Sequence, residues 1–120
     1  MYTLCFVAVV CGQVTKGPEN VAVLVGSNVT LRCAGTDLAW EEYVSDRAGG
    51  AATISHKTSL VHPDKYDLTT EPTGTYDLTI KSIQLNQGGL YRCKALRSVT
   101  SYIFCQVITF SGETLLLFLP

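Results

Sequence analysis

The sequence predicts an all-β protein that folds as one two-layered sandwich, and three observations support this fold class. Short runs rich in β-branched and aromatic residues alternate with Gly, Pro, Asn and Asp, and no segment has helical periodicity. The chain has 120 residues, of which 47% are hydrophobic and 16% are charged, so one packed core is expected and disorder is not. Residues 28–34 alternate strictly, which places Val29, Leu31 and Cys33 on one buried face.

The strands of the N-terminal half are separated by short turns. An edge strand over 21–25 follows Gly17-Pro18, and the turn at Gly26-Ser27 leads into the alternating strand over 28–34. The strand over 38–43 follows after a tight connection, with Leu38 and Trp40 directed inward.

The strands of the C-terminal half are shorter and are bounded by Gly, Pro and Asp. A turn at 48–50 and a break at 62–64 delimit two short middle strands. The predicted strands are 53–56, 59–61, 65–70, 75–83, the strand that contains Tyr91 and Cys93, and a last strand over 102–110, for which 110–118 is the alternative.

Four short stretches carry a resemblance to a known family. They are Leu31-Arg32-Cys33, Leu38-Ala39-Trp40, Leu78-Thr79-Ile80 and Gly89-Leu90-Tyr91-Arg92-Cys93. In this order they resemble the immunoglobulin superfamily, whose fold is a Greek-key β-sandwich. The resemblance implies that a Cys33–Cys93 disulfide joins the two sheets, that Trp40 packs against it, and that the Tyr91 hydroxyl ties down a corner. Leu78, Ile80 and Gly89 are the accompanying core positions.

The spacing favours the variable type of this domain, with the intermediate type as the alternative. Sixty positions separate Cys33 from Cys93, which leaves room for the two extra middle strands of the variable type. We expect the domain to span 13–119. Gln87 stands where the family usually has an Asp that forms an ion pair, so that pair is not expected here.

The C-terminal stretch resembles the joining segment of antigen-receptor variable domains. Phe110, Thr114 and Leu116 match the pattern Phe-Gly-any-Gly-Thr-any-Leu, whereas Ser111 and Glu113 replace its two glycines. The alternative is a plain apolar last strand. If the likeness holds, the chain is similar to variable-type immune receptors of invertebrates and primitive chordates, with its third binding loop within 97–102.

Cysteine content and the N-terminal residues point to an extracellular location. Five cysteines in a short chain are typical of an oxidising compartment. The apolar run over 4–11 followed by Gly12 predicts a signal peptide over 1–12, and an ordinary first strand is the alternative. No apolar run is long enough to span a bilayer. Asn28-Val29-Thr30 is an N-glycosylation acceptor sequence, so we expect a glycoprotein, secreted or on the outer cell surface.

Cys105 is left over once Cys33 and Cys93 pair. If the leader is removed, Cys105 forms an intermolecular bond or remains a free thiol. If the leader stays, Cys5 or Cys11 could pair with Cys105, because the first and last strands are neighbours in this fold.

Outward positions of the Trp40 and Cys93 strands form the candidate interface. They include Glu41, Tyr43, Arg92 and Lys94, and two further aromatic candidates on the last strand are Tyr102 and Phe104. Opposite charges on adjacent strands predict cross-strand ion pairs. The alternative is a homodimer in which Arg92 or Lys94 meets Glu41 of the partner across a two-fold axis.

Composition and motifs exclude several function classes. A formal net charge of −1 argues against nucleic-acid binding. His56 and His62 lie near turns outside any metal-ligand spacing, and no catalytic or cofactor motif is present, so neither enzyme activity nor a cofactor is expected. We therefore expect a recognition module of an immune-type receptor that binds a protein or microbial-surface ligand. The alternative is an adhesion domain of a larger surface protein that makes homophilic contacts.

Overall fold

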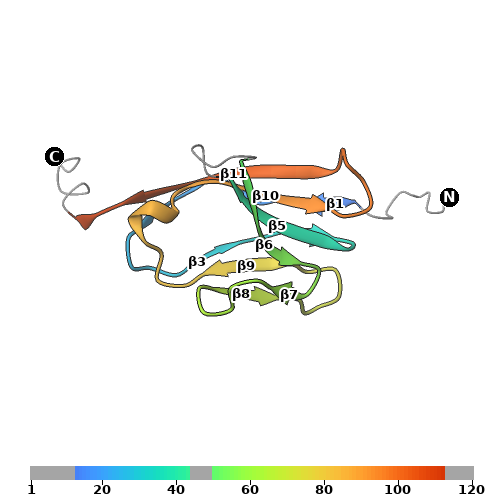
Figure 1. Ribbon diagram of the computed structural model, residues 1–120, viewed down its shortest axis with the longest axis horizontal. Coiled ribbons are helices and arrows are strands. Elements are labelled where there is room, and N and C mark those ends of the chain that lie inside the picture. Colours follow the sequence, from blue (N-terminus) through green and yellow to red (C-terminus); the bar gives the residue numbers. More distant parts are fainter. Residues whose placement is uncertain (1–12, 44–49, 113–120) are drawn as a thin grey trace.

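The computed structural model describes residues 13–43 and 50–112, which form two main β-sheets packed face to face (Figure 1). The larger sheet has the order β2 (Val21–Leu24), β11 (Tyr102–Phe110), β10 (Gly89–Ala95), β5 (Leu38–Tyr43), β6 (Ala51–His56) and β7 (Ser59–Leu60). The facing sheet has the order β3 (Val29–Leu31), β9 (Asp77–Ile80) and β8 (Tyr66–Thr69). A short pair is formed by β1 (Val14–Lys16) and β4 (Ala34–Gly35), and the 3₁₀ turn η1 (Leu85–Gln87) precedes β10.

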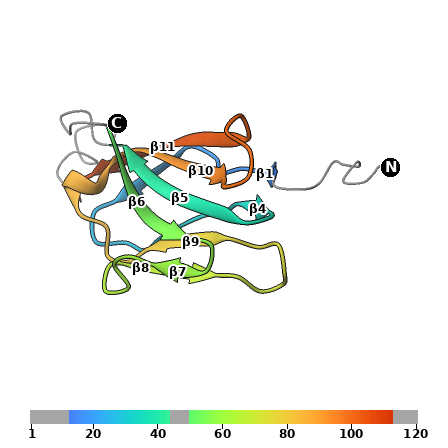
Figure 2. The ribbon, with the colours of Figure 1, turned by 45° about the vertical axis from the view of Figure 1, so that its right-hand side comes forward.

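The predicted all-β sandwich is confirmed, and two further strands extend one of its sheets. β6 and β7 extend the larger sheet beyond β5, which is where the variable type places its additional strands. Figure 2 shows β6 beside β5, with β7 at the sheet edge close to β8. The larger sheet therefore has the two additional strands that the variable type would require.

Several predicted boundaries differ from the observed ones. The strand expected over 28–34 is divided into β3 and β4, and the strands expected over 65–70 and 75–83 are shortened to β8 and β9. The last strand is β11, which corresponds to the predicted strand over 102–110. Three other predicted segments lie wholly or mostly outside the described residues: the leader over 1–12, the turn at 48–50 and the alternative last strand over 110–118. The turn η1 was not predicted, because three residues are too few to produce a helical pattern.

The core lies between the two sheets and follows from the period-two alternation of their strands. In the smaller sheet Val29 lies opposite Ile80 and Leu31 opposite Leu78, and all four are buried. The larger sheet covers them with the buried side chains Leu38, Trp40, Ile54, Tyr91, Cys93, Ala95, Cys105 and Val107.

The first part of the chain crosses from one side of the sandwich to the other at Gly17. β1 pairs with β4, whereas β2 runs parallel to β11 at the edge of the larger sheet. A side chain at Gly17 would overlap the side chain of Ile103, so the crossing requires a glycine. Within residues 13–43 and 50–112 no other strand or helix covers the outer surface of β10, β11 and β5.

Candidate functional site

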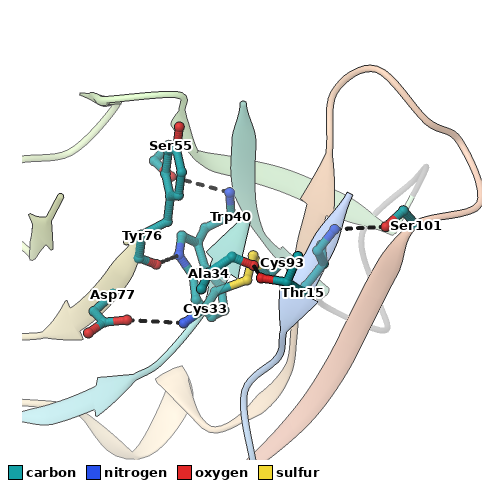
Figure 3. Close-up of a disulfide and its surroundings, with 10 residues drawn as sticks. Thr15, Cys33, Ala34, Trp40, Ser55, Tyr76, Asp77, Cys93 and Ser101 are labelled. Carbon is teal, nitrogen blue, oxygen red and sulfur yellow. Dashed lines mark hydrogen bonds between the residues drawn. A yellow bond between two sulfur atoms is a disulfide. The ribbon is translucent and has the colours of Figure 1, made fainter. Parts of the chain in front are cut away.

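A disulfide and a tryptophan fix the distance between the sheets beneath the candidate site. Cys33 and Cys93 form the expected bond, with their Cα atoms 6.6 Å apart. Trp40 is fully buried, and its Nε1–H donates to the carbonyl of Tyr76 at 2.7 Å (Figure 3). The N–H of Cys33 donates to Asp77 Oδ1 at 3.1 Å. These contacts make β5 and β10 a rigid base.

The corner before β10 is held by Tyr91. Its hydroxyl donates to the carbonyl of Gln87 at 2.6 Å, which is the contact expected from the family resemblance. Burial raises the pKa of Tyr91 far above its usual range, and nearby Glu42 adds to this effect, so the hydroxyl remains a donor. The Gln87 side chain accepts the N–H of Gln84 at 2.7 Å instead of taking part in an ion pair. Gly89 has φ +149°, a conformation that side-chain-bearing residues rarely adopt.

The outer face of the larger sheet is set by the same alternation. Because Tyr91 and Cys93 point inward, Leu90, Arg92 and Lys94 point outward from β10. The register places Arg92 directly opposite Glu41 on β5 and opposite Phe104 on β11. Arg92 therefore lies in the middle strand of three, with partners on both sides.

Six of these side chains make one connected group, which we call the Arg92 cluster: Arg92, Glu41, Lys94, Tyr43, Tyr102 and Phe104. Arg92 Nε and Nη2 both donate to Glu41 Oε1, at 3.0 and 2.5 Å. Lys94 Nζ lies 2.7 Å from Glu41 Oε2, so one carboxylate is shared by two cations.

Three aromatic rings surround the guanidinium. Arg92 Cζ lies 5.3 Å from the ring centroid of Tyr43, 5.1 Å from that of Tyr102 and 5.5 Å from that of Phe104. Phe104 meets the other two rings edge to face, with centroids 5.3 Å from Tyr43 and 5.6 Å from Tyr102. These distances are within the range of favourable cation–π and aromatic contacts. Arg92 is therefore fixed by ion pairs and by aromatic contacts.

The charge state of Glu41 follows from two opposing effects. Burial alone would raise the pKa of this carboxyl, but the hydrogen bonds and charges of Lys94 and Arg92 outweigh burial and lower the pKa. Glu41 is thus ionised at neutral pH. With two cations and one anion, the cluster has a surplus of one positive charge.

The structure distinguishes between the two interpretations of these charges. The predicted cross-strand ion pairs are present. The Glu41 side chain is only 9% exposed and is bound by cations of its own chain, so it does not present a carboxylate to a second copy. The register places both cations beside Glu41 within one chain, so the pairing of Glu41 with a partner's Arg92 or Lys94 stays a prediction that would require these intrachain pairs to open.

The exposed apolar part of the face is larger than predicted. Tyr102 and Phe104 are 43% and 38% exposed, as expected for outward residues. Leu90 is 37% exposed beside Tyr43, and Ile108 is 54% exposed further along β11. Neither Leu90 nor Ile108 was predicted as an interface residue, although the alternation around Tyr91 and along the last strand could have identified them.

Cys105 lies in the core rather than at the surface. It is opposite Tyr91 in the register, is 1% exposed and is free. Burial raises the pKa of its thiol to about 11. A thiol in this position does not reach another chain, so the intermolecular bond considered from the sequence is not supported. Cys5 and Cys11 lie outside the described residues.

The remaining candidate residues are not members of the cluster, although the register places His56 on the same outer face, two strands from Lys94. Asn28 is exposed at the start of β3, and its Oδ1 accepts the N–H of Ser82 at 2.8 Å. His56 and His62 are exposed. Within 13–43 and 50–112 no three His, Cys, Asp or Glu residues are grouped closely enough to hold a metal ion. The same residues contain no helix with the length and hydrophobicity of a transmembrane segment.

Comparison with known proteins gives similarity at the level of fold. No protein-family model and no curated protein matches the sequence. A structure described as the RIG-5 IG1 homodimer has a TM-score of 0.69 and 17% identity, and covers 82% of this chain and 96% of that one. Dpr1 IG1 bound to DIP-eta IG1 has a TM-score of 0.69 and 16% identity, and covers 85% of this chain and 98% of that one. The Ig1 domain of mouse SynCAM 2 has a TM-score of 0.65 and 13% identity, and covers 83% of this chain and 97% of that one. The chain therefore has the immunoglobulin-like fold.

Proposed function

We propose that this chain is an extracellular recognition domain of an immune-type immunoglobulin superfamily protein, and that it binds a protein partner through the outer face of the larger sheet. The observation that carries the proposal is the Arg92 cluster, in which three aromatic rings surround a fixed arginine on an uncovered face. Tyr, Phe and Arg are enriched in protein interfaces, and Tyr and Arg are enriched among the residues that dominate binding energy.

The rigidity of the cluster supports a role in binding. Ordering a flexible side chain on association costs about 0.5–1.5 kcal/mol. Arg92, Glu41 and Lys94 are already held together by ion pairs in the free chain, so that cost is largely avoided. Leu90 and Ile108 enlarge the apolar area around them.

Two further lines of support concern location and partner type. The Cys33–Cys93 disulfide suits an oxidising compartment, and the leader proposed over 1–12 would direct the chain there. Two of the similar structures are described as a homodimer and as a complex of two IG1 domains, so protein partners are a reasonable first choice here. A secreted protein that begins at Gln13 in N-terminal sequencing would support the leader.

Alanine substitution on the two faces tests the proposal. Phe104→Ala removes an exposed ring, and Thr69→Ala is the matched control on the opposite sheet. In a binding screen against extracellular proteins and bacterial surface polymers, we expect Phe104→Ala to weaken binding at least about tenfold and Thr69→Ala to leave it unchanged. A ligand bound equally by both variants would show that the face is not the docking surface. A bacterial polymer as the ligand would favour the microbial-recognition role implied by the joining-segment likeness.

Homophilic adhesion is the second candidate, and it is favoured by the self-complementary aromatic character of Tyr43, Tyr102 and Phe104. One similar structure, RIG-5 IG1, is described as a homodimer. Light scattering over a concentration series distinguishes the two candidates. A dimer that Phe104→Ala dissociates would establish the homophilic contact, whereas a monomer at all concentrations would exclude it.

A further inference from the structure

The outer face of the larger sheet is positively charged although the chain as a whole is not. The formal net charge of the chain is −1. Among the outward residues of the described strands β2, β11, β10, β5, β6 and β7, the acidic side chain is Glu41, the cationic ones are Arg92 and Lys94, and His56 is counted as neutral in the formal charge. Two cations and one carboxylate leave a surplus of one positive charge. At the adjoining loop, Arg97 is paired with Asp37 at 3.0 Å and adds no net charge.

A small hollow opens beside the two cations. It has a volume of about 180 Å³ and is lined by Arg92, Lys94, Ala95, Leu96, Ser98, Val99 and Tyr102. Pockets for drug-sized ligands are usually about 300–1,000 Å³, so this hollow suits one side chain rather than a free small molecule. Leu96, Val99 and Tyr102 form its apolar wall, and the cations form its polar wall.

The cations have hydrogen-bonding capacity beyond Glu41. An ammonium has three N–H donors and a guanidinium has five. Lys94 Nζ contacts one Glu41 oxygen, and Arg92 directs Nε and Nη2 to the other. A second carboxylate beside Lys94 would neutralise the surplus charge at a site where partial burial weakens screening by water. The Lys94 side chain is 31% exposed and so can be reached from solvent.

The same charge distribution disfavours a second copy as the partner. In a symmetric dimer whose two-fold axis passes through the cluster, Arg92 and Lys94 would approach the same residues of the other copy, while Glu41 is already occupied in each copy. Like charges opposed across an interface are unfavourable and act against the wrong partner.

We propose that the partner of this face is an acidic protein segment, one of whose carboxylate side chains enters the hollow beside Lys94 and Arg92. The proposal rests on the proposed function, because it names the chemistry of the partner at the same face. It also explains why three rings surround Arg92: they exclude water from the ion pairs that a partner would complete.

A pair of peptides tests the proposal on the full chain. The probe is an N-acetylated, C-amidated peptide of four glutamates and one tyrosine, and its control has glutamines in place of the glutamates. We expect the glutamate peptide to shift the NMR amide signals of Lys94, Leu96 and Ser98, and the glutamine peptide to leave them in place. Raising the NaCl concentration from about 0.02 M to about 0.5 M should weaken binding, because salt screens partly exposed charges.

Two lysine variants test the location. Lys94→Gln should weaken binding of the glutamate peptide about three- to fivefold, whereas Lys65→Gln, which removes the same charge from an exposed position on the other sheet's side, should leave it unchanged. If both variants lose the same affinity for the glutamate peptide, the binding depends on the overall charge of the chain and not on the hollow, and the proposal is overturned. If glucuronate binds at the hollow as tightly as the glutamate peptide or more tightly, the hollow is assigned to an acidic glycan. That result would also overturn the proposal of a protein partner.

The outcomes separate this proposal from the proposed function. If both peptides bind equally and Phe104→Ala abolishes binding, the docking face stands and the acidic partner is wrong. If neither peptide binds, the acidic partner is overturned, and the result of the Phe104→Ala screen then decides independently on the docking face.

Discussion

Replacing Arg92 with methionine tests whether the cluster is a stable, preformed unit. The change removes the guanidinium but keeps an unbranched apolar side chain between the rings of Tyr43 and Phe104. Glu41 then retains Lys94 as its remaining cation in the cluster. The perturbation therefore isolates the contribution of the central charge.

The magnitude follows from the contacts that are lost. Removing one partner of a fully buried ion pair costs about 3–5 kcal/mol. Arg92 is 18% exposed and Lys94 still neutralises Glu41, which lowers the cost, whereas the lost cation–π contacts add about 0.5–1 kcal/mol. We expect Arg92→Met to lower the free energy of unfolding by about 2–4 kcal/mol. Lys94→Met, at a more exposed position with one contact to Glu41, should cost about 0.5–1 kcal/mol.

Urea unfolding followed by tryptophan fluorescence measures both values, because Trp40 is the single tryptophan and is fully buried. A double-mutant cycle with Glu41→Gln should give a coupling energy between Arg92 and Glu41 of about 1.5–3 kcal/mol. Equal costs for Arg92→Met and Lys94→Met, or a coupling energy close to zero, would refute the reasoning. The cluster would then be a loose surface group that must be ordered on binding.

Three further predictions concern stability and reactivity. Replacing Cys33 and Cys93 together with alanine should lower the free energy of unfolding by about 4 kcal/mol, because their bond closes a loop of 60 residues and so limits the entropy of the unfolded chain. Urea unfolding measures this loss, and a value below about 1 kcal/mol would contradict the estimate. Cys105 should react with a thiol reagent only in denaturant, since burial holds its pKa at about 11; rapid labelling of the native chain would place it at the surface. The pKa of Glu41 is lowered from 4.5 in the folded chain, so its contribution to stability is complete above pH 4.5 and is lost as the pH falls through the folded pKa. The free energy of unfolding should therefore depend less on pH in Glu41→Gln than in the unchanged chain. The same pH dependence in both would argue against the ion pairs.

The features that the sequence predicted well are those with a local or covalent cause. Trp40 and Tyr91 have inward positions because their strands alternate, and alternation can be read within a few residues. The Cys33–Cys93 pairing came from the resemblance, and the fold leaves those two cysteines facing each other across the core. The extra strands β6 and β7 were anticipated from the spacing of the same two cysteines.

The members of the Arg92 cluster and their cross-strand ion pairs were predicted, but which residues lie directly opposite each other was not, because this depends on the register between distant segments. Alternation gives the outward direction of Arg92 and Glu41, but they are 51 residues apart, and only the pairing of β10 with β5 places them opposite each other. The same pairing rule, applied to β11, turns Cys105 inward opposite Tyr91. Counting cysteines left Cys105 as a free thiol, an intermolecular partner or a partner of Cys5 or Cys11, because the count contains no information about burial.

The two sheets have different outer surfaces, and this difference has a structural origin. The outer face of the smaller sheet is polar: Thr30 and Thr79 share a hydrogen bond of 2.9 Å, and Asn28, the proposed glycosylation site, lies on the same side. A glycan there would project away from the Arg92 cluster. The larger sheet has its rings and shared carboxylate on the three strands that rest directly on the disulfide and Trp40. The disulfide-linked part of the core thus supports a face with exposed aromatic and aliphatic side chains, which is the combination that a preformed docking face requires.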